Sequence, residues 1–118
     1  MDGADEFGVI ASTRYKRQKN KEKNMVKFNL TNKDDIQILS FEIEGGILEP
    51  QEISSIKLPS VDYKKMIIIS GRGPIWLYGF LIHELHPSVA VGVHDPRLGG
   101  VIIQSHSTKY KVGDVISL

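Results

Sequence analysis

Apolar and polar residues alternate over two short segments, the pattern of strands with one covered face. Val26, Phe28 and Leu30 share one face of the first segment, and a polar stretch at 32–35 separates it from a second alternating segment at 36–43. Two such segments joined by a polar turn predict a β-hairpin.

The middle of the chain changes from a continuous apolar run to helical spacing. Residues 66–69 are all apolar and mostly β-branched, as in a central strand that is covered on both faces. Glycines interrupt the run at 70–73, and Pro74 suits the first turn of a helix, where its missing N–H is not needed. Apolar residues at helical spacing then predict a helix over 75–86.

A further strand and hairpin follow this helix. Valines alternate over 89–93, and a tight turn at 95–100 reads D-P-R-L-G-G. Mainly apolar segments at 101–104 and 115–118 predict two further strands. Residues 49–56 fit either a short helix or the end of a strand. The whole pattern predicts an α/β fold: a single small Rossmann-like domain with a mixed sheet, a central βαβ unit and flanking hairpins.

Length and composition limit the classes of function. A chain of 118 residues supports one domain. The absence of cysteine excludes a disulfide framework, a thiolate zinc site and a cysteine nucleophile, and it suits a reducing compartment. No apolar run approaches the roughly 20 residues that span a bilayer. We therefore expect a soluble, cytoplasmic protein.

The charge is concentrated near the beginning of the chain. Six of the 15 basic and four of the 14 acidic residues lie at 1–24, which leaves nine basic and ten acidic side chains for the rest. Residues 25–118 therefore do not carry the excess of basic side chains that a broad binding surface for a long polyanion requires. We interpret 1–24 as a flexible basic extension, partly of cloning origin, before a domain at 25–118. A nucleic-acid-binding arm is the alternative.

The turn at 70–73 is the first candidate site, because it joins a predicted buried strand to a helix. Free N–H groups and the helix dipole favour an anion there. Gly71 and Gly73 let the backbone approach a ligand, and Arg72 offers forked donors to phosphate oxygens. Any strand-to-helix turn can use glycine, so a purely structural turn remains the alternative to phosphate binding.

The second candidate lies at the end of the next strand, the place where ligands bind in open α/β sheets. Asp95 has the chemistry to hold a divalent cation or accept a proton, and Arg97 to stabilise phosphate charge. The alternative is a capped turn, in which Asp95 accepts backbone N–H groups and Arg97 pairs with a neighbour.

Histidines form the third candidate, because His83, His86, His94 and His106 all fall within 24 positions. The i, i+3 spacing places His83 and His86 on one helix face, where they have the means to share a metal or a proton-transfer role. An antiparallel last hairpin brings His106 beside them. A single histidine is more often an ordinary surface residue than a catalytic one. The four together therefore support a functional role more strongly than any one of them does alone.

The stretch from Ile69 to His106 resembles the smallest CRISPR-associated ring nucleases, the group of the csx-three type. Three blocks carry the resemblance in order, namely I-S-G-R-G-P-I-W-L, D-P-R-L-G and Q-S-H. The upstream F-E-I-E and L-P-S-V-D are similar too, so the resemblance covers about 25–118. It does not extend to residues 1–24.

The resemblance implies a minimal relative of the CRISPR-associated Rossmann-fold domains, a dimer that binds cyclic tetra-adenylate or a short adenylate RNA. It also implies manganese-dependent cleavage that switches off an antiviral second-messenger signal. By position in the motif, the implied catalytic residues are His86, Asp95 and Arg97. The candidate ligand-binding residues are Ser70, Gly71, Arg72, Gly73 and His106. The candidate metal ligands are Asp95 and His83.

Two other functions stay open: a manganese-dependent deadenylating RNA exonuclease and a non-catalytic sensor of oligoadenylates. Geometry adds one further prediction. A helix over 75–86 spans roughly 18 Å, so its ends lie at opposite edges of the sheet. One subunit then cannot bring His86 and Asp95 within about 3 Å of one phosphate. We predict a composite site in which a second dimer, stacked head to tail, supplies His86 and builds a tetramer or filament.

Overall fold

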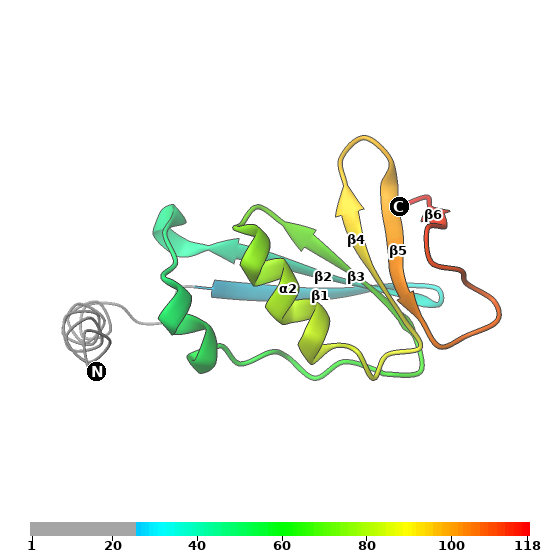
Figure 1. Cartoon of the computed structure of the whole chain (residues 1–118), viewed down its shortest axis with the longest axis horizontal. Helices are drawn as coiled ribbons and strands as arrows, with labels where there is room; N and C mark the ends of the chain where they lie inside the picture. Colours follow the sequence, from blue (N-terminus) through cyan, green and yellow to red (C-terminus); the bar gives the residue numbers. More distant parts are fainter. Residues whose placement is uncertain (1–25) are drawn as a thin grey trace, which may run out of the picture.

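A single six-stranded sheet, with its strands in chain order, organises residues 26–118, the part of the chain that the computed structural model describes (Figure 1). The strands are β1 (Val26–Lys33), β2 (Ile36–Ile43), β3 (Met66–Gly71), β4 (Ala90–Asp95), β5 (Gly99–Ser105) and β6 (Val115–Ile116). The helices are α2 (Ile75–Glu84) and two 3₁₀ helices, η1 (Glu44–Gly46) and η2 (Pro50–Ser55). The predicted extension at 1–24 lies outside the described residues.

The sheet is mixed. Strands β2, β3 and β4 are parallel, while β1 and β5 pair antiparallel with their neighbours β2 and β4, and β6 pairs antiparallel with β5. The predicted mixed sheet, the central unit β3–α2–β4 and the two flanking hairpins are therefore confirmed.

A Rossmann-like arrangement is not confirmed. The doubly wound fold reverses its strand order at a switch point and covers both faces of its sheet with helices. Here the strands follow the chain without reversal, and the segments around η2 and α2 pack on the same face (Figure 1). The two connections between parallel strands, from β2 to β3 and from β3 to β4, move across the sheet in the same direction. Because such crossovers are right-handed, both connections lie on the same face of the sheet.

Two apolar clusters lie on the two faces of the sheet. Beneath α2, the helix residues Leu77 and Leu81 pack with Ile67 and Ile69 of the central strand. On the other face, Met66, Ile68, Ala90 and Ile102 are buried, with Tyr110, Ile116 and Leu118 from the end of the chain packed on them. The central strand β3 is thus covered on both sides, as its continuous apolar sequence predicts.

Helix α2 ends two residues earlier than the sequence pattern predicts. Its last residue is Glu84, and Leu85 closes it with a hydrogen bond from its N–H to the Leu81 carbonyl. His86 precedes Pro87, and a residue before proline disfavours the helical conformation. The ten-residue helix is about 15 Å long. His86 therefore lies in the turn after the helix.

The ambiguous segment before β3 forms the 3₁₀ helix η2, which a capping box between Glu49 and Glu52 begins. Within residues 26–118, no helix combines the length and apolar character required to cross a membrane.

Candidate functional site

A cleft of about 600 Å³ opens at the ends of β3 and β4, which we call the carboxyl edge. Its volume lies within the range of ordinary ligand sites. The residues that line it are Ser70, Gly71, Arg72, Tyr78, Val93, His94, Asp95 and Pro96. A neighbouring hollow of about 580 Å³ shares Arg72 and extends along the end of β2. The first two sequence candidates, the turn at 70–73 and Asp95, therefore meet in one cleft.

The turn at 70–73 is shaped by packing against Phe41 of β2. A Cβ atom on Gly71 would lie 2.6 Å from the Phe41 carbonyl oxygen, and one on Gly73 would lie 2.8 Å from the Phe41 ring. The Tyr78 hydroxyl donates a 2.6 Å hydrogen bond to the Gly71 carbonyl. Burial raises the pKa of Tyr78. The glycines thus have a structural role whether or not a ligand approaches.

Asp95 caps the turn that follows β4. Its Oδ1 atom accepts hydrogen bonds from the N–H groups of Arg97 at 2.7 Å and Leu98 at 3.2 Å, and the Arg97 Nε lies 3.6 Å away. The Arg97 N–H, with smaller contributions from Leu98 and the guanidinium, lowers the pKa of Asp95. The capped turn is therefore present. It uses Oδ1, whereas Oδ2 has no hydrogen bond to the described residues.

Ser70 and His94 form a pair that the sequence analysis did not single out. The Ser70 Oγ lies 2.9 Å from the His94 Nδ1. Ile69 of β3 is paired with Val93 of β4, so the next residue on each strand reaches the same height on the opposite face, away from α2. The sequence does show that His94 and Asp95, as neighbours on one strand, face opposite sides of the sheet. It does not show the register between β3 and β4, which places His94 beside Ser70.

The other three histidines meet where β3 and β4 begin, which we call the amino edge. The rings of His83 and His86 are stacked with centroids 6.2 Å apart. The His86 Nδ1 lies 3.2 Å from the His83 carbonyl, and the His86 carbonyl accepts from Gln104 Nε2 at 2.8 Å and His106 Nε2 at 3.1 Å. The predicted grouping of these three is confirmed, and His94 is separate from it.

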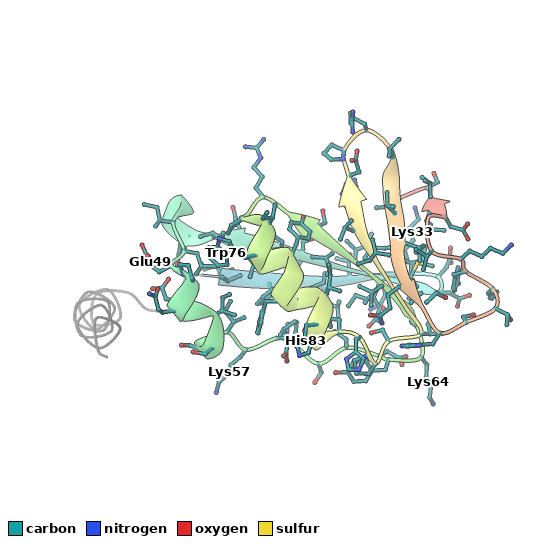
Figure 2. The ribbon with its side chains drawn as sticks, viewed as in Figure 1. Lys33, Glu49, Lys57, Lys64, Trp76 and His83 are labelled. Atoms are coloured by element: carbon teal, nitrogen blue, oxygen red, sulfur yellow. The ribbon has the colours of Figure 1, made fainter. Side chains whose placement is uncertain are left out.

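The structure does not bring the candidate metal ligands His83 and Asp95 together within one chain. Helix α2 runs from the carboxyl edge back toward the amino edge, and Figure 2 shows Trp76 near its beginning and His83 near its end. In residues 26–118, no group of three or more His, Cys, Asp or Glu residues is arranged to hold a metal ion. Asp95 would need ligands from elsewhere to complete a metal site.

Comparison with known proteins identifies the family. The family model of the CRISPR-associated protein (Cas_csx3) matches residues 41–117. This chain belongs to the Cas_csx3 family. An uncharacterized protein of Aquifex aeolicus (strain VF5) is 49% identical to it over 88 residues, which cover 70% of this chain and 78% of that protein. The Cas_csx3 match includes the cleft at the carboxyl edge and the histidines at the amino edge. The predicted CRISPR association is thus confirmed.

Proposed function

We propose that this Cas_csx3 protein is a metal-dependent ring nuclease that binds and cleaves cyclic tetra-adenylate in the cytoplasm, and so ends type III CRISPR antiviral signalling. The observation that carries the proposal is the cleft at the carboxyl edge, where the exposed cation Arg72 and the carboxylate Asp95 line one site. A phosphodiester needs a cationic group to hold it and a means of activation, and this pair supports both.

Arg72 and the backbone of the turn hold the phosphates. Arg72 is exposed, and α2 begins without a side-chain cap, so its first N–H groups face the same turn. Both features favour an anionic ligand at the carboxyl edge.

Asp95 fits one ligand position of a divalent cation, for which we propose manganese. Its pKa is lowered, so it is ionised at neutral pH, and its Oδ2 is without a hydrogen bond to residues 26–118. A cation that binds one carboxylate commonly takes its other ligands from water and substrate phosphate. When bound, the metal would supply Lewis-acid activation of the phosphodiester.

The position of His86 supports a composite site. His86 lies at the amino edge, and its Nδ1–H faces the His83 carbonyl, because a carbonyl only accepts; its Nε2 then remains as an acceptor. We propose that two dimers stack head to tail on the ligand, so that His86 of one faces Asp95 of the other. Tetramers or filaments would then form when adenylate binds.

The decisive experiment incubates labelled cyclic tetra-adenylate with the protein, with and without manganese, and separates ring from linear products. Asp95→Asn is the sharp variant, because the asparagine oxygen still accepts the two N–H groups of the turn while the charge is lost. Asp114→Asn is the matched control, because Asp114 also accepts an N–H group of a turn, that of Lys111, and it lies outside the cleft.

Manganese-dependent ring opening that Asp95→Asn abolishes, and Asp114→Asn does not, supports the proposal. Cleavage of linear adenylate with the ring left intact would make the protein an exonuclease. Tight binding without turnover would make it a sensor. Absence of adenylate binding would contradict every one of these functions.

A further inference from the structure

The Ser70–His94 pair lies in the proposed ligand cleft and has no role in the function proposed above. Both residues line the cleft, and both belong to the face of the sheet opposite α2. The 2.9 Å separation of Ser70 Oγ and His94 Nδ1 joins β3 to β4 where the backbone ladder ends. The His94 Nε2 has no hydrogen bond to a described residue, and His94 is exposed.

The donors and acceptors of the pair complement a hydroxyl group. If Ser70 donates to Nδ1, then Nε2–H remains as a donor and the serine oxygen as an acceptor. If Nδ1–H donates to Ser70, then Nε2 is an acceptor and the serine hydroxyl a donor. Each of these two arrangements presents one donor and one acceptor. A phosphate only accepts, so it matches half of this set, whereas a hydroxyl matches all of it.

We infer that Ser70 and His94 form a subsite for a ribose hydroxyl of the adenylate, which selects ribonucleotides over deoxyribonucleotides. The inference rests on the proposed function, since it takes the adenylate phosphate to be held by Arg72 in the same cleft. In a 3′,5′-linked adenylate, the 2′-hydroxyl is the ribose hydroxyl that stays free within the chain. It both donates and accepts, and it is the group by which proteins distinguish RNA from DNA.

The test compares the dissociation constants of linear tetra-adenylate and its 2′-deoxy counterpart, measured with a chelator present so that metal-dependent turnover does not interfere. The wild-type protein should bind the ribonucleotide about three- to tenfold more tightly, the effect of one net hydrogen bond. Ser70→Ala should remove most of this preference.

Two amide variants separate the nitrogens of His94. His94→Asn places its amide near the position of Nδ1 and lacks a group at Nε2, so the contact with Ser70 can persist while the ligand contact is lost. His94→Gln places its amide near Nε2 and should retain part of the preference. Thr108→Ala removes an exposed hydroxyl from the loop between β5 and β6 and is the control, with an unchanged preference. Thermal unfolding of each variant establishes that it is folded.

The outcomes separate this inference from the proposed function. If the wild-type protein binds the ribonucleotide and the preference survives in both Ser70→Ala and His94→Asn, the subsite is wrong and the proposed function stands. The same holds if the wild-type protein binds both ligands equally. If it binds neither ligand, the proposed function fails first.

Discussion

The two edges of the sheet place their polar groups in different ways. At the carboxyl edge, Arg72, His94 and Asp95 line an open cleft, and Asp95 keeps one carboxylate oxygen outside the turn that it caps. At the amino edge, His86 and His106 each use a ring nitrogen on a backbone carbonyl. The comparison teaches that the first edge leaves charged groups open to a ligand, while the second holds His86 and His106 through hydrogen bonds to the backbone.

Mixing two inactive variants is the strongest test of whether the two edges contribute different parts of one active site. Because His86 and Asp95 lie at opposite edges, His86→Ala and Asp95→Asn should each lose about a hundredfold or more in cleavage rate. An equimolar mixture should recover activity, since the proposed stacks of dimers would then contain junctions with one intact edge of each kind. Single-turnover cleavage assays at several protein concentrations measure the recovery. A mixture that stays inactive, with both variants folded and binding adenylate, would contradict the composite site.

Removal of the cation at the carboxyl edge should have the next largest effect. Arg72→Ala removes the proposed charge-assisted contact with phosphate, so affinity for adenylate should fall roughly ten- to hundredfold. Lys57→Ala, which removes a cation outside the cleft, is the matched control (Figure 2). Fluorescence anisotropy with labelled adenylate measures both. Equal affinities for the wild-type protein and Arg72→Ala would exclude the turn at 70–73 from the ligand site.

Alanine substitutions of two glycines compare how tightly the chain is packed at the carboxyl edge and on the exposed surface of α2. Gly71→Ala forces a methyl group within 2.6 Å of the Phe41 carbonyl, so it should reduce the free energy of unfolding by about 1 to 3 kcal/mol. Gly79→Ala lies in α2 with no atom within 4 Å of the new Cβ, and it should increase stability by about 0.5 to 1 kcal/mol. Urea unfolding of both variants checks the contrast. Equal effects would show that the turn does not depend on close packing.

The smallest effect concerns acid pH. The pKa of Asp95 is lower in the folded protein than its ordinary value of 3.8, so the ionised carboxylate stabilises the fold above that pH. This contribution is lost as the pH falls through the folded-state pKa. The decline in stability below about pH 4 should therefore be shallower for Asp95→Asn than for the wild-type protein. Thermal unfolding between pH 2 and 5 provides the curves, and identical slopes would contradict this assignment.

The sequence by itself determined the strands, the hairpins and the central β3–α2–β4 unit, because side-chain periodicity and turn residues act locally. It also determined the Cas_csx3 family through the blocks around Arg72 and Asp95, and it placed three histidines together, because an antiparallel hairpin has a predictable return. Only the tertiary structure decided the rest. The Ser70–His94 pair depends on the register between parallel strands, and the glycines of the turn depend on Phe41 from a distant strand. Such relations join segments far apart in the chain, so no local pattern records them; packing across the sheet sets them.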